Sequence, residues 1–87
     1  MLTYKAMYKF VDGGVHGEVL DFPGAITCGR DLDEARSLLA GALVDMAETN
    51  LLVGENLSIP NPDISYPGAD LEESVRLVLK PRQGQYY

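Results

Sequence analysis

Apolar and polar residues alternate at the start of the chain, and this pattern predicts a β-hairpin. Between positions 2 and 10 the apolar residues occupy the even positions, namely Leu2, Tyr4, Ala6, Tyr8 and Phe10. A period of two is typical of a strand with one buried face. Asp12-Gly13-Gly14 supplies turn residues, and Val15, Gly17 and Val19 then alternate with polar residues. We therefore expect two antiparallel strands joined by a tight turn.

A third short strand is expected at residues 25–28, and the pattern then becomes helical. Asp31 lies three residues before Glu34, an arrangement that satisfies free amides at the start of a helix. The apolar residues that follow recur at helical spacing: Leu32, Ala35, Leu38, Leu39, Ala42, Leu43 and Met46. This pattern predicts a helix over about 31–50 with one face packed on the sheet.

Residues 53–69 show no hydrophobic period and are rich in glycine and proline, which indicates a loop. Loops of this length are usually functional or mobile, so we expect a contact surface here. Alternation resumes at 74–80 and predicts a last strand that ends before Pro81. The order is β-β-β-α-β, which predicts an α+β fold with an antiparallel sheet of three to four strands and one main helix. We expect one domain over residues 1–81 and a flexible C-terminal tail at 82–87.

The composition argues against several classes of function for this chain. Eighty-seven residues allow one domain with a small core, which favours a homo-oligomer. A formal charge of -6 and a pI near 4.5 disfavour direct binding of nucleic acid. No secretory signal or membrane span is visible, so we expect a cytoplasmic protein that does not bind membranes.

Residues that could carry chemistry have plainer roles. Cys28 is the only cysteine, so neither an intrachain disulfide nor a zinc site built from cysteines is possible, and we expect Cys28 to pack as a small hydrophobe. His16 is the only histidine and is expected to face solvent from the second strand. The sequence therefore predicts no catalytic, cofactor or metal site and a protein that is not an enzyme.

The run DFPGAITCGRDLDEA at residues 21–35 resembles the signature region of HicB-like antitoxins. The family pattern is D-x-P-G-[CA]-x-[ST]-x-G, followed by a helix cap, leucine, acidic residues and Glu-Ala. The matching motif residues are Asp21, Pro23, Gly24, Gly29, Asp31 and Glu34. Residues 54–62, GENLSIPNP, are similar to the family segment G-x-x-[LI]-P-x-P.

This resemblance implies a partial ribonuclease H-like fold without ribonuclease H catalysis. It also implies that the chain neutralises a small, basic, HicA-type ribonuclease toxin, with Phe22, Pro60 and Pro62 as candidate partner contacts. Many family members carry a C-terminal DNA-binding domain. No helical pattern follows Pro81, so we expect a solitary N-terminal domain that does not bind an operator by itself.

Two alternatives remain open. The first is a residual magnesium-dependent nuclease, which would require Asp12, Asp21, Asp31 and Glu34 to converge on one ion. The second is a solitary oligomeric domain that binds some other protein.

Overall fold

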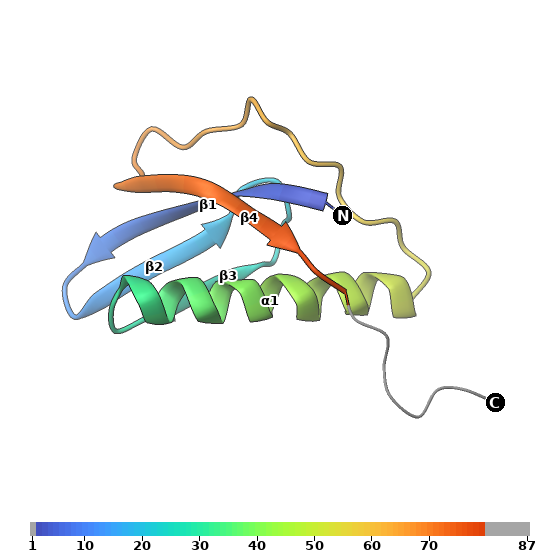
Figure 1. Cartoon of the computed structure of the whole chain (residues 1–87), viewed down its shortest axis with the longest axis horizontal. Coiled ribbons are helices and arrows are strands. Elements are labelled where there is room, and N and C mark those ends of the chain that lie inside the picture. Colours follow the sequence, from blue (N-terminus) through green and yellow to red (C-terminus); the bar gives the residue numbers. More distant parts are fainter. Residues whose placement is uncertain (1, 80–87) are drawn as a thin grey trace.

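The computed structural model describes residues 2–79 and contains one helix and four strands in the order β-β-β-α-β (Figure 1). The elements are β1 (Leu2–Val11), β2 (Gly14–Val19), β3 (Ile26–Gly29), α1 (Leu32–Leu52) and β4 (Leu71–Leu77). The predicted α+β class and element order are confirmed. The ribonuclease H-like description stays a prediction, and the expected tail at 82–87 lies outside the described residues.

The four strands form one antiparallel sheet in the order β3-β2-β1-β4. The hairpin pairs Phe10 with Val15 and Ala6 with Val19. The last strand lies on the other side of β1 and pairs Tyr4 with Val75. The chain reaches this edge after α1 has crossed the sheet and a long loop has returned (Figure 1).

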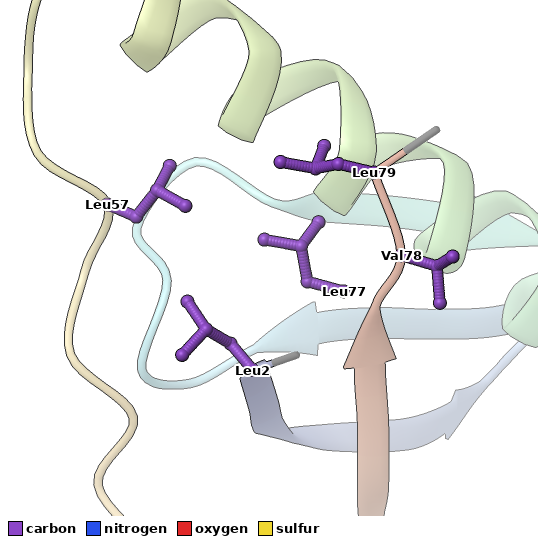
Figure 2. A pocket seen from close by; sticks show the side chains of 5 residues that line it. All are labelled: Leu2, Leu57, Leu77, Val78 and Leu79. Carbon is purple, nitrogen blue, oxygen red and sulfur yellow. The ribbon is translucent and has the colours of Figure 1, made fainter. Parts of the chain in front are cut away.

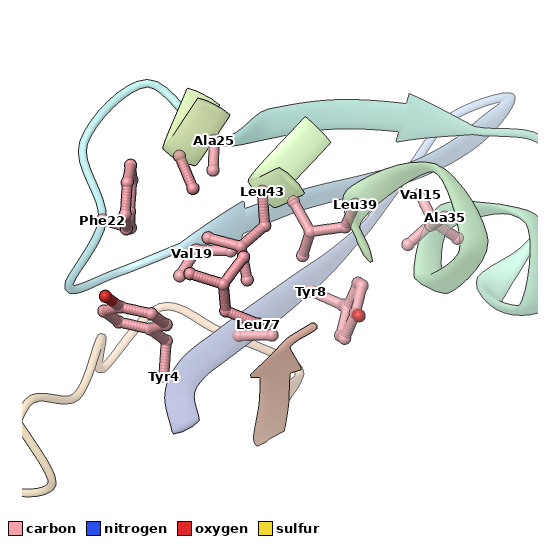
Figure 3. Packing of buried hydrophobic residues seen from close by; sticks show 12 residues of the cluster. Tyr4, Tyr8, Val15, Val19, Phe22, Ala25, Ala35, Leu39, Leu43 and Leu77 are labelled. Atoms are coloured by element: carbon pink, nitrogen blue, oxygen red, sulfur yellow. The ribbon is translucent and has the colours of Figure 1, made fainter. Parts of the chain in front are cut away.

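The core lies between α1 and one face of the sheet (Figure 3). The strands contribute Tyr4, Ala6 and Tyr8 from β1 together with Val15 and Val19 from β2, as the alternation predicted. The buried line of the helix consists of Ala35, Leu39, Leu43 and Ala47, which are spaced by four residues. Small alanines at both ends of this line let the helix axis come close to the sheet.

Leu38 is a correction to the predicted helix face, because its side chain is 46% exposed. It precedes Leu39 by one residue and therefore points about 100° away round the helix axis. Met46 is half-buried and packs against the core from one side. The contact stripe is thus narrower than the set of apolar residues in the sequence.

A charged contact fixes the first half of α1 to the edge of the sheet. The guanidinium of Arg36 donates two hydrogen bonds to the carboxylate of Glu73 in β4, at 2.9 and 3.0 Å. Planar guanidinium and carboxylate groups match in this two-bond geometry, which adds orientation as well as energy. The pair ties together residues far apart in the chain.

Element boundaries differ from the predictions by a few residues. The helix ends two residues later than expected, and β3 is shifted by one residue toward its C-terminus. The larger difference concerns β4, which was predicted at 74–80 but spans Leu71–Leu77. It begins earlier because Glu72 and Glu73 pair with Met7 and Ala6 of β1. Adjacent acidic residues hide a strand from a search for alternating hydrophobics. No helix within residues 2–79 is long and apolar enough to span a membrane.

The face of the sheet opposite α1 is partly covered by the loop between α1 and β4, residues 54–70 (Figure 1). Side chains at odd positions of β1 point to this face. The ammonium groups of Lys5 and Lys9 donate to the loop carbonyls of Ile64 and Gly68, at 3.3 and 3.5 Å. Met7, between the two lysines, is only 3% exposed. The loop therefore acts as a partial second layer.

The narrow helix stripe makes a direct prediction for stability. Leu43→Ala should lower the free energy of unfolding by about 2–5 kcal/mol, because Leu43 is fully buried and the substitution leaves a cavity. Leu38→Ala removes the same atoms from an exposed position and should change it by less than about 1 kcal/mol. Urea denaturation followed by circular dichroism measures both. Equal losses in the two variants would contradict the packing described here.

Candidate functional site

Asp21 holds the loop against the sheet. Its carboxylate accepts one hydrogen bond from the backbone amide of Lys5 in β1, at 2.9 Å, and another from the backbone amide of Asn61 in the loop, at 2.8 Å. The residue is 8% exposed and is the only buried polar or charged residue within positions 2–79. Its two oxygens therefore join a strand to a loop segment forty residues away in sequence.

A second hydrogen bond fixes the loop beside this clamp. The hydroxyl of Tyr4 donates to the carbonyl of Ser58 at 2.6 Å. Burial, and then the negative charge of Asp21, raise the pKa of Tyr4 above its ordinary value, so the hydroxyl remains a donor. The loop thus follows the sheet along residues 58–61 instead of extending into solvent.

Pro23 and Gly24 form the turn that leads from β2 to β3. Gly24 has a φ of +95°, a conformation that residues with a Cβ rarely adopt. A Cβ at this position would also lie 2.6 Å from the terminal methyl of Met46. The positive φ therefore requires glycine at this position of the motif, whereas the flexible end of Met46 could move aside for a Cβ.

The end of the motif starts the helix. A Cβ at Gly29 would lie 2.6 Å from the amide nitrogen of Ala35, so only glycine lets β3 approach α1 so closely. Asp31 caps the helix by accepting a 2.8 Å hydrogen bond from the amide of Glu34. Glu34 in turn accepts bonds from the backbone amide and the guanidinium of Arg30. Asp31 and Glu34 thus form the expected cap, with the reciprocal bond one residue earlier than usual.

The candidate partner contacts do not share one environment. Phe22 is 1% exposed and packs edge-to-face on Tyr4 with ring centroids 5.3 Å apart, which corrects the expectation that it contacts a partner. Pro60 is half-buried and Pro62 is exposed. Pro62 lines a cleft of about 380 Å³ whose other walls include Asp21, Asn61 and Ser74. The loop prolines therefore remain available, whereas Phe22 belongs to the core.

An apolar groove lies at the end of β1 and β4 (Figure 2). Its volume is about 400 Å³, and the residues that line it all have apolar side chains: Leu2, Leu57, Leu77, Val78 and Leu79. Figure 2 shows Leu57 of the loop on one side of this space and Leu77 and Leu79 on the other. Grooves of this kind accept apolar side chains of a partner.

Sequence reasoning missed this groove because its residues come from three separate segments. One signal was present, since Leu77-Val78-Leu79 breaks the alternation that a half-buried strand requires. Leu57 was another, as an apolar residue in a mostly polar part of the loop. Together they mark a place where apolar side chains exceed what one sheet face can bury.

The other candidate residues do not assemble into a catalytic centre. No group of three or more histidine, cysteine, aspartate or glutamate side chains within residues 2–79 could hold a metal ion. Asp21 and Asp31 are engaged in the separate hydrogen bonds given above, and Asp12 is exposed in the hairpin turn. His16 is paired in the sheet with Cys28, which is exposed on the face opposite α1. The expectation that Cys28 packs in the core is therefore wrong.

The double acceptor role of Asp21 predicts a loss of stability in Asp21→Asn. The asparagine side chain has only one acceptor oxygen. The backbone amide of either Lys5 or Asn61 would therefore face the side-chain NH2 group and lose its hydrogen bond. The free energy of unfolding should fall by about 1–3 kcal/mol in urea denaturation. Asp63→Asn makes the same charge change on an exposed loop residue and should have little effect. Equal stability of Asp21→Asn and the parent chain would contradict the clamp.

The cap predicts a pH dependence. Side-chain and then backbone hydrogen bonds from Arg30 hold the pKa of Glu34 below its ordinary value. Its contribution to stability is therefore present above the ordinary pKa of glutamate and is lost as the pH falls through the lowered one. In a carboxyl titration by NMR, Arg30→Ala should raise the pKa of Glu34. Arg36→Ala should not, since Arg36 bonds to Glu73. An unchanged pKa in Arg30→Ala would contradict the cap.

No protein-family model matches the sequence, and no curated protein matches it closely. Among solved structures, the N-terminal domain of the antitoxin HicB from Burkholderia pseudomallei is similar, with a TM-score of 0.68 and 22% sequence identity. The alignment covers 90% of this chain and 100% of that domain. Four antiparallel strands, one helix and the turn from Asp21 to Gly29 thus build the fold of a HicB antitoxin N-terminal domain, as the signature run predicted.

Proposed function

We propose that this chain is an antitoxin-like protein-binding module that neutralises a small, basic ribonuclease of the HicA type. The observation that carries this proposal is the shared fold, which extends over the whole of the HicB N-terminal domain. The run at residues 21–35 supports it independently, because the chain uses Asp21, Gly24 and Gly29 to shape this fold.

The proposed contact surface is the apolar groove together with the loop that forms one of its walls. Leu57, Val78 and Leu79 supply apolar area, and the exposed Pro62 extends the surface along the loop. Interfaces gain most of their binding energy from a few residues that are buried in well-packed pockets, and this groove could receive such a residue of the partner. The clamp at Asp21 would hold this surface ready before a partner arrives, which lowers the entropy lost on binding.

The net charge of the chain would raise the rate of association with such a partner. The chain carries -6, and the ammonium groups of Lys5 and Lys9 on the open sheet face are already directed at loop carbonyls. The net negative charge would steer a basic ribonuclease toward the chain and would repel the phosphates of nucleic acid. We place this function in the cytoplasm and assign the chain no cofactor.

The proposed role is inhibition by binding and involves no turnover. The nuclease alternative is not favoured, because Asp21, Asp31 and Glu34 each have a structural hydrogen-bond partner of their own. The remaining alternative, a solitary domain that binds some other protein, shares the same groove and differs only in the identity of the partner.

The test uses the protein encoded beside this chain. RNA cleavage by that neighbour should stop when the chain is added in molar equivalence. Leu79→Asp should weaken inhibition about tenfold or more, because it puts a charge in the groove. Leu38→Asp alters a similarly exposed leucine on the outer side of α1 and should inhibit like the parent chain.

Three outcomes would overturn the proposal. The neighbouring reading frame could encode no small basic protein, or its product could cleave RNA undiminished with the chain in excess. Alternatively, the chain alone could cleave RNA with magnesium and lose this activity in Asp21→Asn, which would make it a nuclease.

Stopped-flow measurements of the chain and its neighbour should also show slower association at higher salt and a nearly constant dissociation rate.

A further inference from the structure

The last strand, β4, is an open edge of the sheet. Only β1 flanks it among the described residues. The amide of Leu20 bonds to the carbonyl of Lys5, so odd positions of β1 direct their backbone toward β2. The carbonyl of Tyr8 accepts from the amide of Asp70, so even positions face β4.

This alternation decides which groups of β4 lie on the open edge. Leu71, Glu73, Val75 and Leu77 pair with the even positions of β1 and direct their backbone inward. The residues between them, Glu72, Ser74 and Arg76, therefore present their amides and carbonyls outward. An edge of this kind can accept another antiparallel strand.

The side chains of β4 are complementary to a second copy of the same strand. We propose that two copies of this chain pair through β4 in antiparallel fashion, with a two-fold axis at Ser74. In this register Glu72 of each copy lies opposite Arg76 of the other, so two pairs of opposite charge form on the open face. Leu71 lies opposite Leu77 of the other copy on the core face, and the whole strand Leu71–Leu77 is paired.

The neighbouring registers fit less well. A two-fold axis at Glu73 places two copies of Glu73 against each other. An axis at Val75 removes both pairs of Glu72 with Arg76, because Arg76 then lies opposite Ser74. Each also shortens the paired segment. Like charges directly opposite destabilise a strand pair, whereas opposite charges stabilise it by roughly 0.2–1 kcal/mol. Only the register centred on Ser74 combines full overlap with matched charge.

The charged groups near this edge leave the pairing possible. Arg76 makes no ion pair within residues 2–79, and its side chain is exposed. Glu72 accepts a hydrogen bond from the amide of Tyr66 and lies 3.9 Å from the ammonium of Lys5. This arrangement fixes the carboxylate on the open face, where the guanidinium of the second copy would meet it. Charges on an edge strand commonly prevent association, but here their order makes them self-complementary.

The other edge strand of the sheet, β3, lacks charged residues that could pair with a second copy of itself. Strand β3 has four residues, Ile26–Gly29, and none of them is charged. By the same alternation, Ile26 and Cys28 direct their amides away from β2. Cys28 thus provides a matched control position on the other edge.

Light scattering at micromolar concentration should return a mass near twice 9.5 kDa. Arg76→Glu and Glu72→Arg should each weaken the dimer about tenfold or more, because each creates two pairs of like charge. Mixed in equal amounts, the two variants should form a heterodimer in native mass spectrometry, since every Glu–Arg pair is then restored. Circular dichroism checks that each variant is folded.

A substitution that leaves charge untouched gives a second test. Ser74→Pro removes an amide that faces the open edge and should yield a folded monomer, because the bonds between β1 and β4 do not use it. Cys28→Pro removes an outward amide from β3 and should remain dimeric. Three results would each overturn the proposal. The parent chain could be monomeric at 100 micromolar, which is about 100 times a typical micromolar dissociation constant. The two charge variants could fail to associate when mixed, or Cys28→Pro could be the only variant that dissociates the dimer.

Discussion

A single helix can cover only one face of a four-stranded sheet, and the rest of this structure depends on how the second face is treated. The chain places a loop on it and fastens that loop with the carboxylate of Asp21, which binds the amides of Lys5 and Asn61. A buried carboxylate is costly unless its oxygens are satisfied, so strand and loop must stay together for either to be stable. The position of the groove follows, because the clamped loop presents Leu57 to the end of β4.

The fold was predictable because its signals are local. The N-cap at Asp31 and the strand alternation each depend on neighbouring residues, and they determined the helix start and the buried residues of β1. The glycine positions were also local, since Gly24 and Gly29 are set by the turn and by the approach of α1.

The site was less predictable because it depends on contacts between distant segments. The sequence could not show that Phe22 packs on Tyr4, or that Cys28 points away from the helix, since both depend on which face of the sheet α1 covers. The start of β4 was missed because Glu73 points inward and is neutralised by Arg36, a pairing that no local pattern reveals.

The central claim is that the loop and the groove form the surface that binds a ribonuclease. Hydrogen–deuterium exchange of the chain, with and without the small basic protein encoded beside it, tests this claim most directly. The account predicts that binding slows exchange at residues 57–62 and at Val78 and Leu79, while the exposed positions of α1 between Arg36 and Asp45 stay unchanged. Slowed exchange confined to those helix positions would contradict it.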